Sequence, residues 1–179
     1  MTEEKKEKWL NYLALTTVIL AVCATLSTFK GGNFSTRAVM SQSQASDQWA
    51  YYQSKGIKEY IYDIQKEKLE LELKALGPRV QKQVAEEYEM KIESYSKKVK
   101  KYEEEKARIE KDAKALEDIR DEAQKHTKAF GMAVIFLQIA ILLSSISALM
   151  KKKPLWMLGL VVGVFGVVYF VNGFMLFMK

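Results

Sequence analysis

Cysteine, histidine and proline are scarce in this chain of 179 residues, which has one cysteine, one histidine and two prolines. No disulfide can form within one chain, because Cys23 has no second cysteine to pair with. Zinc sites are built mainly from several histidine and cysteine ligands, which this sequence cannot supply, and we expect no metal or other cofactor. The scarcity of proline also leaves long stretches in which nothing interrupts a helix.

Charge is absent from three long apolar segments, at residues 9–29, 129–150 and 155–178. Each is long enough to cross a bilayer, which takes about twenty apolar residues in a helix. Because backbone groups in hydrocarbon must bond within their own segment, we expect three transmembrane helices with these bounds. The first segment is too long for a signal peptide and lacks a small-residue cleavage pattern, so we interpret it as an uncleaved signal anchor.

The formal net charge of +6 does not indicate a nucleic-acid binder. Residues 30–128 hold 21 basic and 19 acidic side chains, which is a balanced mixture rather than a basic face. Much of the excess lies in the short basic loop 151–154, where lysine orients a membrane protein. We therefore place the charged N-terminus, residues 1–8, and this loop in the cytoplasm. The region 30–128 and the C-terminus would then lie outside it.

The segment between the first two apolar runs is predicted to be helical and extramembrane. Lys30-Gly31-Gly32-Asn33 is typical of a helix end, and Ser35 or Thr36 can cap a new helix. Gly77-Pro78 is the one strong break, since proline disfavours helix in the residue before it. No glycine or proline lies between Arg79 and Lys128, so the second arm should run directly into the second apolar helix.

Both arms show steps of three and four residues, the pattern of a left-handed coiled coil. The predicted seam before the break comprises Ile57, Ile61, Ile64, Lys68, Leu71 and Ala75. The predicted seam after it comprises Tyr88, Ile92, Tyr95, Val99, Tyr102, Lys106, Ile109, Ala113 and Leu116. The expected fold is an all-α membrane protein: three transmembrane helices with a long antiparallel, coiled-coil-like helical hairpin at 30–128.

Folding the chain back at the predicted tip, Gly77-Pro78, places Phe29 opposite His126. Both arms would then close on one membrane surface, and the hairpin would reach roughly 70 Å from it. The alternative is a bent pair of helices in which residues 35–50 lie on the membrane surface.

Small residues form one face on each apolar helix, and such faces let helices approach closely in lipid. The face of the third comprises Gly159, Gly163, Gly166 and Gly173. That of the first comprises Ala14, Thr17, Ala21, Ala24 and Thr28, and that of the second Ala133, Leu137, Ala140, Ser144 and Ser147. These faces can pack within one chain or between chains. A long hairpin that buries little favours neighbours, so we expect a homo-oligomer.

Polar residues near the membrane give no sign of catalysis. Gln138 and Asn172 lie inside apolar segments, where a single amide more often bridges helices than marks a pathway. His126 is interpreted as an interfacial polar residue rather than a titrating switch. The absence of charge within the spans argues against an ion-coupled transporter, and no catalytic motif is present, so we do not expect an enzyme.

Three segments carry a family resemblance: Trp9-Leu-Asn-Tyr-Leu-Ala-Leu-Thr-Thr17, Leu26-Ser-Thr-Phe-Lys-Gly-Gly32 and Ser46-Asp-Gln-Trp-Ala-Tyr-Tyr-Gln-Ser-Lys55. In these three segments the chain resembles the bacterial domain-of-unknown-function family 4337. The resemblance implies a bacterial inner-membrane protein with one apolar helix, a charged helical middle and two further apolar helices. It implies no activity, and no site residue is carried over.

The sequence thus leads to two functional hypotheses. The first is a non-enzymatic structural or scaffold protein, anchored in lipid, that self-assembles through its transmembrane faces and stalks and can hold an unidentified protein partner. The alternative is a channel or transport-accessory subunit, in which the third helix and Asn172 line or pack a pore.

Overall fold

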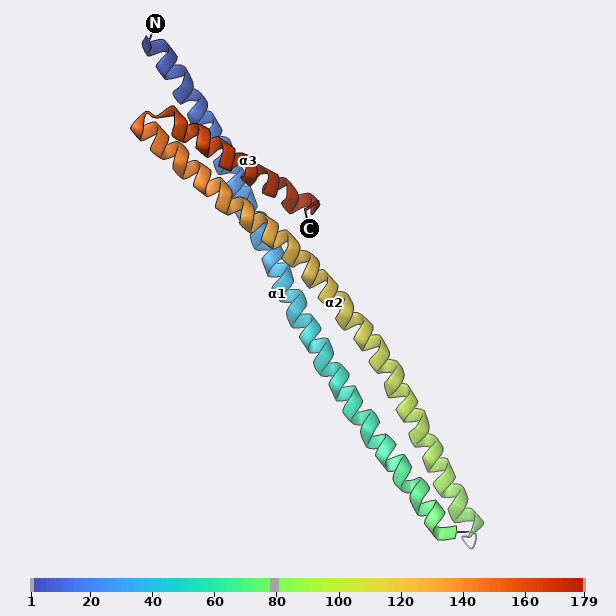
Figure 1. Cartoon of the computed structure of the whole chain (residues 1–179). Coiled ribbons are helices and arrows are strands. Elements are labelled where there is room, and N and C mark those ends of the chain that lie inside the picture. Colours follow the sequence, from blue (N-terminus) through green and yellow to red (C-terminus); the bar gives the residue numbers. More distant parts are fainter. Residues whose placement is uncertain (1, 78–80, 179) are drawn as a thin grey trace. The chain divides into compact units, whose positions relative to one another are not determined.

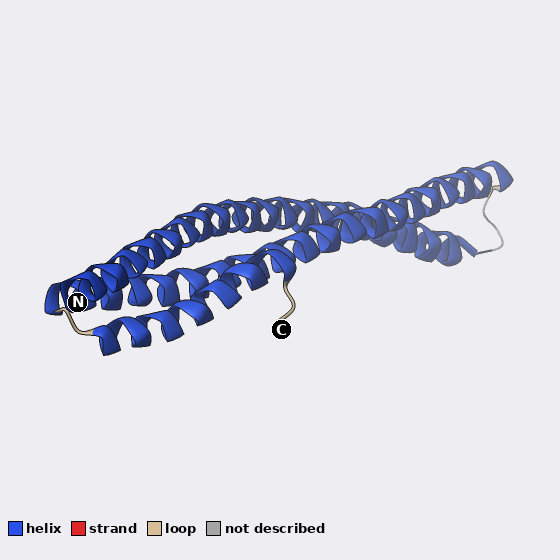
Figure 2. Cartoon of the chain, turned by 90° about the horizontal axis from the view of Figure 1, so that it is seen from above, coloured by secondary structure: helices blue, strands red, loops and turns tan. Residues whose placement is uncertain are grey.

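A computed structural model describes residues 2–77 and 81–178, with the side chains of 2–7 left out. Within this part helices joined by short loops are the only regular secondary structure, and there is no strand (Figure 1 and Figure 2). Its helices are α1 (Thr2–Leu76), α2 (Lys82–Met150) and α3 (Lys153–Met175). Each contains a stretch that is long and apolar enough to cross a membrane.

The predicted helix end at Lys30–Asn33 is wrong, because α1 continues through both glycines as one helix of 75 residues. A Cβ added to Gly31 would lie only 3.1 Å from the Cβ of Phe130 in α2. The missing side chain therefore lets the two helices approach closely. A glycine in a helix costs about 1 kcal/mol relative to alanine, and packing against α2 offsets that cost here.

The helix ends follow local chemistry. After α1, Gly77 takes φ of +64°, a left-handed conformation that glycine adopts without strain. Pro78, the other residue of the predicted tip, lies outside the described residues. Between α2 and α3 only Lys151 and Lys152 are non-helical, so α3 begins before the proline that was expected to end the loop. Pro154 lies in the first turn of α3, where its missing amide leaves no hydrogen bond unmade.

The chain divides into two compact units. Unit 1 comprises Met1–Met40 and Ile119–Lys179, and unit 2 comprises Ser41–Asp118. In unit 1 the three helices enclose a core of small and medium side chains, formed by Leu20, Ala24, Ala133, Leu137 and Ala140.

In unit 2, α1 and α2 lie side by side and antiparallel (Figure 1). Only four described side chains of this unit are buried: Ser41, Ala45, Ile109 and Ala113. This pair of helices therefore has almost no apolar core of its own.

The pairing of α1 with α2 is displaced from the predicted one by more than a helical turn. His126 stacks on Phe34, with ring centroids 4.2 Å apart, rather than facing Phe29. The physical reason is the length of the connection. Since α2 begins only at Lys82, the chain turns back later than a reversal at Gly77-Pro78 would allow.

Candidate functional site

The glycine face of α3 packs against α1 and α2 of the same chain. All four of its glycines are buried. A Cβ on Gly166 would lie 2.7 Å from Leu137 Cγ, and one on Gly173 would lie 2.6 Å from Phe130 Cε1. The corresponding distances are 3.2 Å from Gly159 to the Ala140 carbonyl oxygen and 3.1 Å from Gly163 to Leu20 Cδ2. This face is therefore filled within one chain.

The small-residue face predicted for α2 is fully buried in the bundle. Its five members, Ala133, Leu137, Ala140, Ser144 and Ser147, are all 0% exposed. The Ser147 hydroxyl donates to the Lys152 carbonyl at 2.7 Å and so holds the turn into α3. Small side chains at these positions let α2 approach both other helices at once.

The face predicted for α1 is displaced. Ala14 and Thr28 are exposed and Thr17 and Ala21 are half-buried, so only Ala24 lies in the core. The buried positions of this stretch instead include Trp9, Leu13, Leu20 and Ser27. The reason is complementary packing: α3 has a glycine at Gly163, and Leu20 of α1 fills the space beside it.

Aromatic residues cluster at the end of unit 1 near the α2–α3 turn. The rings of Trp9 and Trp156 lie 6.2 Å apart, and Lys153 Nζ lies 5.8 Å from the Trp9 ring. The Trp156 indole nitrogen donates to the Thr16 hydroxyl at 3.3 Å. Tryptophan with a bonded N–H beside lysine is typical of the interface between a membrane and water.

His126 links α2 to the last turn of α3. Its Nδ1 lies 2.8 Å from the Gly173 carbonyl oxygen, a geometry in which the protonated nitrogen donates to the carbonyl. Carbonyls in the last turn of a helix lack intrahelical partners, so this bond caps α3 from outside. His126 thus serves as a helix-to-helix contact.

The two amides of the apolar segments lie in opposite environments. Asn172 is only 4% exposed, and its Oδ1 accepts the Met178 backbone N–H at 2.8 Å. Its own carbonyl accepts the Leu176 N–H at 2.8 Å, so Asn172 caps its own helix rather than bridging two helices as expected. Gln138 is exposed on α2 and has no hydrogen-bond partner among the described residues.

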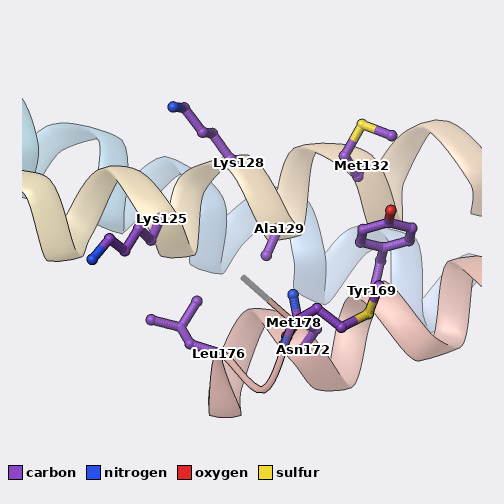
Figure 3. A pocket seen from close by; sticks show the side chains of 8 residues that line it. All are labelled: Lys125, Lys128, Ala129, Met132, Tyr169, Asn172, Leu176 and Met178. Carbon is purple, nitrogen blue, oxygen red and sulfur yellow. The ribbon is translucent and has the colours of Figure 1, made fainter.

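A cavity of about 650 Å³ lies between α2 and the C-terminal end of α3, open on one side (Figure 3). Lys125 and Lys128 project from opposite sides of α2 at one end of it, with Lys125 on the side of α3, and apolar side chains and Tyr169 line the remainder. Asn172 is the one buried polar side chain in its wall. Its full lining is Lys125, Lys128, Ala129, Met132, Tyr169, Asn172, Leu176 and Met178. Nowhere in the described ranges do three metal-ligating side chains gather.

Long polar side chains join the two helices of unit 2. Lys55 pairs with Glu105 at 2.7 Å and Lys106 with Glu59 at 2.8 Å. The close contact with Glu105 raises the pKa of Lys55, and the same contact lowers the pKa of Glu105. Farther along, Tyr62 lies between two rings of α2, with centroids 5.5 Å from Tyr95 and 5.9 Å from Tyr102.

The α1 seam predicted for unit 2 is wrong, whereas the α2 seam faces its partner. All six α1 positions are exposed: Ile57, Ile61, Ile64, Lys68, Leu71 and Ala75. All nine α2 positions are buried or half-buried. Because α1 uses Lys55, Glu59 and Tyr62 toward α2, its most apolar face points away from α2. We call Ile57, Tyr60, Ile61, Ile64 and Leu71 the isoleucine stripe.

Residues 9–176 match the family described as domain of unknown function (DUF4337). The chain belongs to the DUF4337 family. No curated protein and no solved structure matches it.

In this DUF4337 protein the cavity is the main feature that sequence reasoning missed. Lys125 and Lys128 resemble other lysines of the charged region, and nothing in the sequence brings Tyr169 or Leu176 near them. One sequence signal for the cavity was the position of Lys128 directly before an apolar segment. A basic residue at that position lies at the level of the lipid headgroups.

Proposed function

We propose that this DUF4337 protein is a non-enzymatic scaffold or interaction protein, held in a membrane by three transmembrane helices, that self-associates. The observation that carries the proposal is the isoleucine stripe. Its five side chains are between 44% and 67% exposed. A contiguous apolar face of this kind on a charged helix marks a surface that another helix covers.

Membrane anchoring is supported by the side chains that unit 1 turns outward. In the apolar stretches these are mostly valine, leucine, isoleucine and phenylalanine, for example Val18, Ile135, Leu142, Val164 and Phe165. Lipid is the solvent in which such a surface is stable.

A second copy of the chain is the occupant that best fits the stripe. Exposed charges of both signs flank it, from Lys58, Glu67 and Lys68. The same face on a neighbour can meet each charge with its opposite, which a strongly basic or acidic partner could not do. The small core of unit 2 favours such an arrangement, because further burial stabilises two otherwise marginal helices.

Gln138 supports association within the membrane as well. It lies near the middle of the apolar stretch of α2, on a face with Gly131 and Ser145 at seven-residue spacing, all three exposed. A side-chain amide both donates and accepts, so two copies can satisfy each other across a two-fold axis. Hydrogen bonds of this kind contribute about 1 kcal/mol in lipid.

For location we propose the bacterial inner membrane, with the N-terminus and the turn at Lys151–Lys153 in the cytoplasm. The hairpin and the C-terminus then lie in the periplasm. The lysine content of the two short segments supports this orientation, since short cytoplasmic segments are enriched in lysine and arginine.

The experiment counts chains per particle for the full-length protein in nanodiscs by mass photometry. We expect a defined oligomer, and the triple substitution Ile57→Gln, Ile61→Gln, Ile64→Gln should shift it toward monomer. Met90→Gln is the matched control, because Met90 is an exposed apolar residue of α2 outside the stripe. A monomeric wild type would refute self-association.

No observation favours the channel alternative. The glycine face of α3 is occupied by Leu20, Leu137 and Phe130. Asn172 is buried against its own chain, and its oxygen accepts the Met178 N–H. We therefore do not extend the proposal to ion conduction.

A further inference from the structure

We propose that the cavity between α2 and α3 binds one anionic phospholipid, with its headgroup at the end lined by Lys125 and Lys128 and an acyl chain along Met132 and Tyr169. This inference rests on the membrane anchoring proposed above. It adds a ligand class and a site to that proposal.

The charge at the cavity is suited to an anion. Lys125 and Lys128 lie one turn apart on α2, and both are exposed. The nearby carboxylate of Asp121 is paired with Arg120 Nε at 2.8 Å. Its pKa is lowered mainly by this bond to Arg120 and, to a smaller extent, by the charge of Lys125, which forms no ion pair with it. No carboxylate among the described residues forms an ion pair with either lysine, so both ammonium groups are available to a ligand.

The position of the cavity matches the boundary of a bilayer. Lys128 immediately precedes the charge-free segment 129–150, and the cavity continues from the lysines past Ala129 to Met132 and Tyr169 (Figure 3). A phospholipid has the same order of parts, with a charged headgroup followed by an apolar chain. Basic pockets between membrane helices bind anionic headgroups in this way.

Asn172 supplies a third polar contact. Its Oδ1 is bonded to the Met178 N–H, which fixes the orientation of the side chain. The amide nitrogen has no partner among the described residues, so its N–H groups can donate to a phosphate or ester oxygen. A buried, oriented donor beside two lysines distinguishes this site from scattered surface charge.

The cavity has a charged half, formed by the lysines, and an apolar half. A ligand that uses both halves must be a lipid rather than a free phosphate. The ammonium groups favour a net negative headgroup over a zwitterionic one, by roughly thirtyfold for two lysines near a membrane surface. The apolar half adds affinity only for a ligand that carries a chain.

The test uses delipidated full-length protein in a neutral detergent and native mass spectrometry. Dioleoyl phosphatidylglycerol, dioleoyl phosphatidylcholine and glycerol 3-phosphate are added separately. We expect one phosphatidylglycerol per chain, bound roughly thirtyfold more tightly than phosphatidylcholine, and no retention of glycerol 3-phosphate. Equal binding of the two lipids, or retention of glycerol 3-phosphate as strong as that of the lipid, would overturn the proposal.

Variants assign the binding to this cavity. Lys125→Gln with Lys128→Gln should reduce phosphatidylglycerol binding to the phosphatidylcholine level. Met132→Trp, which fills the apolar half, should weaken both lipids. The matched control is Lys151→Gln with Lys152→Gln, two exposed lysines at the other end of the apolar stretch of α2. Unchanged selectivity in the first variant, or equal loss in the control, would refute the site.

Failure of this inference is separable from failure of the proposed function. Alkaline extraction of membranes reports whether the protein is integral, and mass photometry of the same preparation reports its copy number. An integral oligomer without lipid selectivity overturns the lipid site alone. A protein that alkali releases from membranes overturns the anchoring and the lipid site together.

Discussion

Leu20 of α1 lies against Gly163 of α3, so closely that a Cβ on the glycine would be 3.1 Å from Leu20 Cδ2. This contact joins the first apolar helix to the last, and Leu20 is part of the core of unit 1. Because the glycine has no side chain, the large leucine side chain fits beside it. Packing of this kind lets all three helices share a single core.

Gly166→Ala should destabilise the bundle by about 1–3 kcal/mol, the usual cost of overpacking. The new methyl group would lie 2.7 Å from Leu137 Cγ and 3.0 Å from the Leu137 backbone nitrogen, which cannot easily move. Thermal unfolding in detergent, followed by circular dichroism, measures the change. In the control Gly32→Ala nothing lies within 4 Å of the added atom, so higher helix propensity should leave stability equal or greater. Equal effects of the two substitutions would contradict this packing.

His126→Ala should loosen the end of α3 without unfolding the bundle. The substitution removes the bond to the Gly173 carbonyl, which has a net value of about 1 kcal/mol, together with the ring stacked on Phe34. Hydrogen–deuterium exchange should accelerate at Leu176 and Met178, whose amides bond to Asn172. Gln124→Ala, an exposed change on the same helix, should leave exchange there unaltered. Unchanged exchange in His126→Ala would show that the bond does not hold this end.

The pairing of α1 with α2 in unit 2 should depend on pH through Glu105. The contact with Lys55 lowers the pKa of this carboxyl below its ordinary value of 4.5. The folded state binds the proton less tightly than the unfolded state, so the contribution is complete above pH 4.5 and is lost as pH falls through the lowered pKa. Acid titration of helix content should show a larger loss in wild type than in Glu105→Gln, which keeps the contributions of Glu93 and Asp121.

A second measurement isolates the pair. A double-mutant cycle of Lys55→Gln and Glu105→Gln at pH 7 should give a favourable coupling energy. The same cycle on Lys97 and Glu93, neighbours within α2 that are far more exposed, should give less. Equal coupling in the two cycles would show that shielding between the helices adds nothing.

Gln138→Leu should weaken self-association by about 1 kcal/mol per amide pair. Förster transfer between labelled copies in micelles, followed on dilution, measures the effect. Gln138→Asn keeps an amide and should lose less. Ile135→Leu on the same exposed helix is the control, since it changes shape without removing a polar group. Unaltered transfer in Gln138→Leu would place this residue outside any interface.

The sequence predicts the helices of this fold well. It predicts less well which faces of these helices contact one another. The seam along α2 is correctly placed because its aromatic and aliphatic residues recur without a competing apolar face. On α1 the isoleucine stripe is the most periodic apolar feature, yet Lys55, Glu59 and Tyr62 face α2. Apolar periodicity identifies a helix face that is stable only when it is buried. Which element buries that face depends on the side chains of the neighbouring helix as well.

Packing also overrides local propensity in places that composition cannot reveal. Gly31 and Gly32 are poor helix formers, so the sequence indicates a helix end there. In the structure the helix continues, because Gly31 packs closely against Phe130. The small residues of α1 indicate a packing face in the sequence. In the structure Leu20 packs in the core instead, because Gly163 of α3 leaves space for it. The cavity depends on contacts between α2 and the end of α3, which are distant in sequence.

The turn between α2 and α3 bears on how the protein is made. Only Lys151 and Lys152 separate the helices, and Ser147 holds the turn through its hydroxyl and through its carbonyl, which accepts the Lys152 N–H at 3.2 Å. Such a short link leaves no slack for one segment to insert while the next remains in the translocation channel. We therefore expect the apolar segments of α2 and α3 to enter the bilayer together, as one unit.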